Sequence, residues 1–134
     1  MKRIVFNRIL VLAMLIYSVF VFLPYFYGSL YSEEELNFLF YMPVNPLFEI
    51  PYWFGWIIYA LSMFCYLSIY FGYTIVRYLY VAVLFFNVLF SALSGVAAYT
   101  GFEISVIVIL STIDGIILSF LFLKNKILVD YLAA

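Results

Sequence analysis

The chain has 134 residues, of which 69% are hydrophobic and 10% are charged, and its formal net charge is -1. Soluble domains carry roughly 25% charged residues, so a chain with a mean hydropathy of +1.20 cannot cover a water-facing surface and is typical of an integral membrane protein. Histidine is absent and Cys65 is the single cysteine, which excludes a disulfide framework, a zinc site, a histidine-held haem and a Cys–His nucleophile pair within one chain.

Four apolar segments each approach the ~20 residues that a transmembrane helix needs. We expect them at about residues 4–23, 52–71, 75–99 and 104–123. Short connections separate the second, third and fourth segments, and they predict a close antiparallel series of helices. The sequence therefore predicts an all-α fold in which the whole chain forms one membrane domain, a four-helix antiparallel bundle.

The connection after the first segment, which is expected to stop at Pro24, is long and covers residues 25–51 on the outer side. Within it, the run from Ser32 to Glu35 has the pattern of a capping box, in which the serine hydroxyl accepts from a backbone N–H and the glutamate reaches back. Apolar residues follow this run. We expect a short helix over residues 33–42 that lies on the membrane surface.

The basic residues are distributed unevenly along the chain. With four spans, all of them fall on one side, which the positive-inside rule places in the cytoplasm. They are Lys2, Arg3, Arg8, Arg77, Lys124 and Lys126. The expected location is a bacterial inner (cytoplasmic) membrane with both termini cytoplasmic, and the outer side carries acidic residues only.

Asp114 lies near the middle of the fourth apolar segment. A charged side chain there costs at least ~2.5–3.5 kcal/mol on insertion scales, so it should be partnered or neutral. Counting outward from a turn near Gly101 at equal rise per residue places Asn87 at the same depth. Ser91 and Ser111 belong to small-residue faces that let helices approach closely. We therefore expect an intramembrane polar cluster of Asp114, Asn87, Ser91 and Ser111.

Two interpretations of Asp114 remain open. An intramembrane acid is by default a candidate for proton, ion or ligand handling, but a polar cluster also fixes the register between helices. Glu103 has the spacing of a second capping box with Thr100. Arg77 is expected to reach the inner headgroups, and Cys65 to be a small core residue.

The second segment carries hydroxyl groups at helical spacing, at Tyr59, Ser62 and Tyr66. Such an aromatic stripe could bind a lipid or a partner helix, and packing within the bundle is the simpler expectation.

Three consecutive carboxylates, at Glu33, Glu34 and Glu35, exceed what one helix start requires. Trp53 and Trp56 open the second segment and belong to an expected outer belt of aromatic residues. We expect these five residues to be candidates for binding a protein partner. The alternative is a solvated helix start that prevents wrong insertion.

The fourth segment, "FEISVIVILSTIDGIILSFLFL", is similar to the last helix of small bacterial inner-membrane proteins, and the four-span architecture resembles immunity proteins against pore-forming bacteriocins and secreted membrane toxins. The resemblance implies a non-catalytic protein without cofactor that binds and neutralises a toxin within the lipid bilayer. A small oligomeric channel, holin or carrier using Asp114 and Asn87 stays open, as does an accessory subunit of a membrane complex. The sequence assembles no nucleophile–base pair or metal cluster, and it has no basic tract for nucleic acid.

Overall fold

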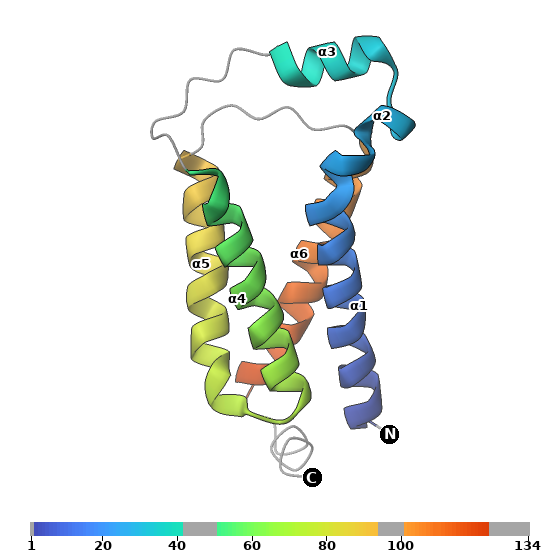
Figure 1. Cartoon of the computed structure of the whole chain (residues 1–134). Helices are drawn as coiled ribbons and strands as arrows, with labels where there is room; N and C mark the ends of the chain where they lie inside the picture. The colour runs from blue at the N-terminus through green and yellow to red at the C-terminus, as the bar shows by residue number, and fades with distance from the viewer. Residues whose placement is uncertain (1, 42–50, 94–100, 124–134) are drawn as a thin grey trace.

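Helices account for every regular element in the part of the chain that the computed structural model describes, residues 2–41, 51–93 and 101–123. Four long helices stand side by side, and a short one lies across one end of them (Figure 1). The elements are α1 (Lys2–Phe22), η1 (Leu23–Phe26), α2 (Tyr27–Leu30), α3 (Glu33–Tyr41), α4 (Tyr52–Tyr70), η2 (Thr74–Val76), α5 (Arg77–Leu93) and α6 (Gly101–Phe122). The predicted all-α fold is confirmed.

Three helical stretches are long and apolar enough to cross a membrane, namely Arg3–Leu30, Trp53–Tyr70 and Gly101–Phe122. The fourth predicted span is described from Arg77 to Leu93, where α5 is an apolar helix of 17 residues. The rest of the predicted segment, up to residue 99, lies outside the described residues.

The first α-helix ends at Phe22, beside the predicted stop at Pro24, but helical turns continue beyond it. A 3-10 turn, η1, takes over at Leu23 and leads into α2, with Pro24 in the first turn of η1. The missing N–H of a proline is harmless at this position, because the first amides of a helix have no partner within the helix. The chain therefore remains helical as far as Leu30.

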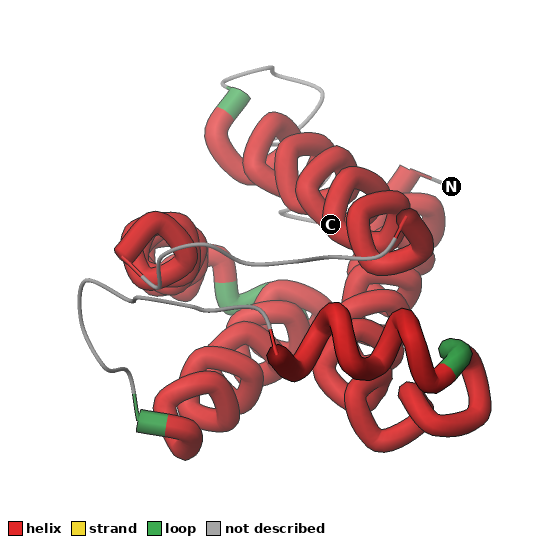
Figure 2. The backbone as a smooth tube through the Cα atoms, turned by 90° about the horizontal axis from the view of Figure 1, so that it is seen from above, coloured by secondary structure: helices red, strands yellow, loops and turns green. Residues whose placement is uncertain are grey.

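The order in which the helices pack differs from the predicted series. α1 packs against both α4 and α6, whereas α5 packs mainly against α4 and makes few contacts with α6. Seen from one end, α5 and α6 stand well apart (Figure 2). The short predicted connection before α6 indicated α5 as its main neighbour. α6 instead packs mainly against α1, the helix furthest from it in the chain.

The connection between α4 and η2 is a tight turn, as the sequence predicted. Gly72 adopts a positive φ of 97°, a conformation that glycine reaches without the steric cost of a Cβ atom. The Tyr73 N–H donates to the Ser68 carbonyl at 2.9 Å, which is the long hydrogen bond of a Schellman helix ending. This turn sets α4 and α5 side by side.

The core forms where α1, α4, α5 and α6 face one another. Its fully buried members include Leu10, Cys65, Tyr66, Tyr80 and Ile117. Cys65 is a core residue, as expected. Tyrosines are unusual at such a position, because each buried hydroxyl needs a hydrogen-bond partner.

Candidate functional site

The polar centre of the bundle is the carboxylate of Asp114 on α6. Its Oδ1 accepts hydrogen bonds from the hydroxyls of Tyr66 on α4, at 2.6 Å, and Tyr80 on α5, at 2.5 Å. Three helices therefore meet at one oxygen atom. Hydrogen bonds between side chains of different helices stabilise helix association in membranes. This group of Asp114, Tyr66 and Tyr80, here called the central joint, therefore holds three helices together.

The two tyrosines of the central joint are positioned by packing. Tyr66 is 1% exposed and Tyr80 is 0% exposed, and their ring centroids lie 5.5 Å apart with the planes tilted by 59°. Aromatic rings prefer such tilted contacts to face-to-face stacking. Both hydroxyls are therefore held in place by their own rings.

Asn87 does not pair with Asp114. It lies on an exposed part of α5, and the Asp114 carboxylate is taken by Tyr66 and Tyr80 instead. Equal depth was the basis of the predicted pair, but depth does not determine which way a side chain faces. The long tyrosine side chains also reach across between helices whose backbones stay apart, which a short amide cannot do.

The other two members of the expected cluster, Ser91 and Ser111, are also exposed. The Ser91 hydroxyl donates to the Asn87 carbonyl of its own helix at 2.8 Å, and Thr112 and Ser119 bond the carbonyls four residues before them in the same way. Such back-bonding satisfies a hydroxyl locally. The small-residue faces therefore need no neighbouring helix, and the predicted cluster does not assemble.

Further hydroxyl contacts join α1 to α4 in the half of the bundle nearer α3. The α3 end is called the outer end here, and the opposite end the inner end, after the predicted orientation. Ser18 Oγ and the Tyr59 hydroxyl lie 2.8 Å apart, and the Tyr17 ring meets the Tyr59 ring edge-on at 5.5 Å. The Ser62 hydroxyl donates to the Ile58 carbonyl of its own helix at 2.8 Å. The hydroxyl stripe of the second segment is thus used for packing within the bundle.

At the outer end, Glu103 is buried and accepts a hydrogen bond from the Tyr27 hydroxyl of α2. Thr100, its predicted capping partner, lies outside the described residues. The contact with Tyr27 ties the start of α6 to the end of the first helical stretch. Because that stretch is helical as far as Leu30, α2 brings the phenol to the carboxylate.

At the inner end, Arg77 connects α5 to the end of α6. Its Nη1 donates to the Leu121 carbonyl at 3.2 Å, and its guanidinium lies 4.8 Å from the Tyr78 ring centroid and 5.3 Å from that of Phe122. A cation is favourable at a helix C-terminus, where backbone carbonyls lack partners. Arg77 thus has a structural contact in addition to any contact with headgroups.

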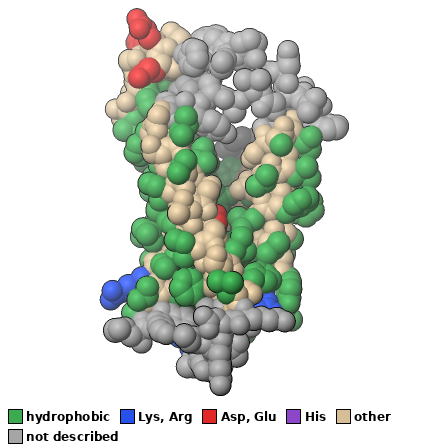
Figure 3. All heavy atoms as spheres, turned by 180° about the vertical axis from the view of Figure 1, so that it is seen from behind, with side chains coloured by type: hydrophobic (Ala, Val, Ile, Leu, Met, Phe, Trp, Pro, Cys, Tyr) green, Lys and Arg blue, Asp and Glu red, His purple; other side chains and the backbone are tan. Residues whose placement is uncertain are grey.

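The acidic residues of α3 divide into two kinds. The Ser32 N–H donates to Glu35 Oε2 at 2.8 Å, and the Glu35 N–H donates to Ser32 Oγ at 3.3 Å, so the predicted capping box is confirmed. Glu33 and Glu34 are exposed. Acidic side chains gather at one end of the molecule and basic ones at the other, and one acidic group is visible at mid-height between hydrophobic side chains (Figure 3).

The two tryptophans at the start of α4 differ in their surroundings. Trp53 is 58% exposed. Trp56 is half-buried, and its ring packs against Phe22 and Tyr59 with centroids 5.7 and 6.1 Å away. Of the two, Trp53 is the side chain that a partner could reach.

Sequence reasoning placed Tyr66 in a packing stripe and missed Tyr80 altogether. Their signal was weak, because the chain has 14 tyrosines and the phenol that reaches a carboxylate is chosen by helix packing. An intramembrane Asp should be compared with tyrosines up to two helical turns away in depth, since their hydroxyls lie far from the backbone.

Within the described ranges, no group of three or more Cys, Asp and Glu side chains is placed to hold a metal ion. No family model matches the chain, and neither a curated protein nor a solved structure was found to match it significantly.

Proposed function

We propose that this chain is a non-catalytic membrane protein that binds another protein, and that it neutralises a pore-forming toxin. The observation that carries the proposal is the central joint, where the Asp114 carboxylate accepts hydrogen bonds from Tyr66 and Tyr80. A carboxylate that joins three helices has a structural use. Because the interior acid already has this use, we place the function on the exposed surface of the bundle and not on a path through its interior.

The proposed membrane arrangement has four spans, α1, α4, α5 and α6, with α3 on the outer surface. The 17 described residues of α5 extend about 25 Å at ~1.5 Å per residue, which is most of a bilayer core of ~30 Å. The opposite placement of basic and acidic side chains supports a single orientation (Figure 3). By the positive-inside rule, the arginine end faces the cytoplasm of a bacterial inner membrane.

The proposed binding surface is the outer end of the bundle. Glu33 and Glu34 are exposed there and are not the carboxylate that caps α3, and Trp53 is exposed at the start of α4. Charge complementarity speeds association and fixes orientation, while an exposed tryptophan supplies apolar contact area. A toxin hairpin with basic residues beside its apolar segment fits such a surface.

A survival assay tests this function. Cells that make the wild-type chain should survive a co-encoded membrane toxin that kills cells without it. The double variant Glu33→Lys/Glu34→Lys should lose protection, because both carboxylates are reversed while the capping pair Ser32 and Glu35 is kept. Asn37→Lys is the control, since it adds a positive charge on an exposed position of the same helix without removing an acid.

Equal protection by the double variant and by Asn37→Lys would contradict the proposed surface. If the wild-type chain protects against none of the co-encoded toxins, the immunity function itself is contradicted. Membrane levels of each variant must be matched by immunoblot, so that loss of protection reports binding and not expression.

A second candidate function is transport, and one observation favours it. Hydroxyl groups occur in series along the interior, from the Ser18–Tyr59 pair past the buried Tyr17 and Ser62 toward the central joint at Asp114. A small oligomeric channel or carrier would use these groups as a relay. Asp114→Asn separates the two functions, because it removes the titratable group and keeps an oxygen acceptor for both tyrosines.

A further inference from the structure

The inner end of the bundle carries a pocket between α1 and α4 that differs from the outer binding surface. Its volume is about 320 Å³, and it is lined by Ile4, Asn7, Arg8, Val11 and Tyr70. The four lining residues of α1 are spaced so that they share one face of the helix. The pocket therefore combines a strip of apolar side chains with a cation, an amide and a phenol.

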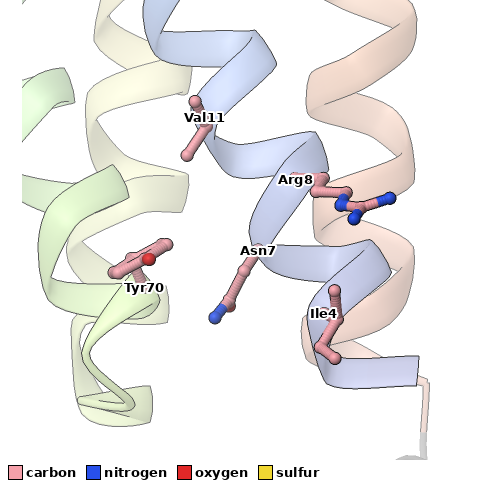
Figure 4. Close-up of a pocket in the computed structure, with 5 residues that line it drawn as sticks. All are labelled: Ile4, Asn7, Arg8, Val11 and Tyr70. Carbon is pink, nitrogen blue, oxygen red and sulfur yellow. The ribbon is translucent and has the colours of Figure 1, made fainter. Parts of the chain in front are cut away.

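The close-up shows how the polar groups are arranged (Figure 4). The Asn7 amide extends into the space between α1 and α4, and Tyr70 lies across from it, whereas the Arg8 guanidinium extends along the other side of α1. Arg8 is exposed and has a long flexible stem, so it can move over the pocket when an anion is present.

A second guanidinium lies close to the same pocket. A Cβ atom built on Gly72 would lie 3.4 Å from Arg3 Nη2, so Arg3 reaches the turn that follows Tyr70. Neither Arg3 nor Arg8 forms an ion pair with a carboxylate of the described residues, and the acidic side chains among those residues lie at the opposite end or at mid-height. Among the described residues, no carboxylate balances the positive charge at this end of the bundle.

We infer that this pocket binds the headgroup of an anionic glycerophospholipid. The phosphate would lie between the guanidinium groups of Arg3 and Arg8, with the Asn7 amide and the Tyr70 hydroxyl as further donors. Basic pockets between membrane helices on the cytoplasmic side are suited to such headgroups. Of the apolar residues on the same helix face, Ile4 is 57%, Val11 40% and Leu15 60% exposed, and they offer an acyl chain a continuous contact.

Charge distinguishes this occupant from a zwitterionic lipid. A phosphatidylcholine headgroup carries its own cation and gains little beside two arginines. A phosphatidylglycerol headgroup has net negative charge, and its hydroxyls can donate hydrogen bonds to the side-chain carbonyl oxygen of Asn7. The apolar strip argues for the whole lipid as ligand, because free phosphate would leave that strip uncovered.

Native mass spectrometry of the full-length protein, released from a mild detergent with equal amounts of phosphatidylglycerol and phosphatidylcholine of matched chains, tests the inference. Wild type should retain phosphatidylglycerol in preference, and Arg8→Gln should reduce that preference by about fivefold, the effect of one cation near a membrane surface. Arg8→Lys is the matched control and should keep most of the preference, since it keeps the charge.

Tyr70→Phe, which removes one donor to the phosphate, should lower the retention of phosphatidylglycerol. Addition of glycerol 3-phosphate in excess should displace little lipid if the acyl chain contributes to binding. Equal retention of the two lipids by wild type, unchanged preference in Arg8→Gln, or full displacement by glycerol 3-phosphate would each overturn the inference. Circular dichroism and gel filtration of each variant show that the fold is kept.

Discussion

Tyr80 on α5 and Asp114 on α6 are joined by a hydrogen bond of 2.5 Å between the phenol oxygen and Oδ1, although the backbones of the two helices make few close contacts. The same carboxylate oxygen accepts a second hydrogen bond, from Tyr66 on α4. Among the described residues, Asp114 is the only acid in the middle of the apolar helices, and it is matched by donors from two neighbours. Its placement gives the bundle a defined arrangement that apolar packing alone would leave loosely specified.

Substitutions of Asp114 should show whether the central joint needs a hydrogen-bond acceptor or a negative charge. Asp114→Leu leaves two buried hydroxyls without their acceptor and should lower the free energy of unfolding by about 2 kcal/mol. Asp114→Asn keeps an oxygen acceptor and should cost less than about 1 kcal/mol. Unfolding in mixed micelles of mild detergent and dodecyl sulfate measures both. Equal losses for Leu and Asn would show that the joint depends on charge and not on hydrogen bonding.

The two tyrosine contacts should be coupled. Tyr66→Phe and Tyr80→Phe should each lower the free energy of unfolding by about 1 kcal/mol, as interhelical hydrogen bonds in membranes do. Because both donate to one oxygen, the double variant should lose a different amount from the sum. Tyr73→Phe, at an exposed position, is the control and should have little effect. Strict additivity in the double-mutant cycle would contradict a shared acceptor.

Arg77 should stabilise the inner end through its planar guanidinium. Arg77→Lys keeps the charge but loses the stacking on Tyr78 and Phe122, so it should lower the melting temperature. Arg77→Met should lower it further, because the Leu121 carbonyl also loses its donor. Thermal unfolding followed by circular dichroism in detergent ranks the three proteins. A Lys variant as stable as wild type would show that only the charge matters.

The Tyr27–Glu103 contact should order the outer end. Tyr27→Phe removes a donor from a buried carboxylate, which is costly because buried charges need hydrogen-bonding partners. Amide hydrogen exchange should become faster in α2 and in the first turn of α6. Protection around the central joint should be unchanged, and a uniform increase over the whole chain would instead indicate global destabilisation.

The capping box of α3 should control that helix locally. Ser32→Ala should lower its stability by about 1 kcal/mol, because one N–H at the helix start loses its acceptor. Faster amide exchange confined to Glu33–Tyr41 is the expected readout. Ser29→Ala, an exposed serine of α2, is the matched control. Equal effects of the two variants would mean that the cap contributes nothing.

Much of the fold followed from the sequence because it depends on local patterns. Apolar length located the long helices, the run from Ser32 to Glu35 marked the start of α3, and Gly72 marked the tight turn. These features act within a few residues of one another.

The partners of Asp114 and the neighbour of α6 could not be predicted in this way. They depend on how the helices rotate and tilt against one another, and a chain rich in tyrosine offers many donors for one acceptor. Pro24 marked the end of α1 but not the end of the helical stretch, because helical turns continue through η1 and α2. Its effect depends on whether the chain restarts a helical turn at that residue.

The central claim is that Asp114 serves the structure and that the protein acts by binding. Proton flux into proteoliposomes, measured with a trapped pH indicator under an imposed membrane potential, tests it most directly. The account predicts that wild type and Asp114→Asn, reconstituted at equal levels, both give the flux of empty vesicles. A wild-type flux well above that level, lost in Asp114→Asn while its fold is kept, would contradict the account and make transport the function.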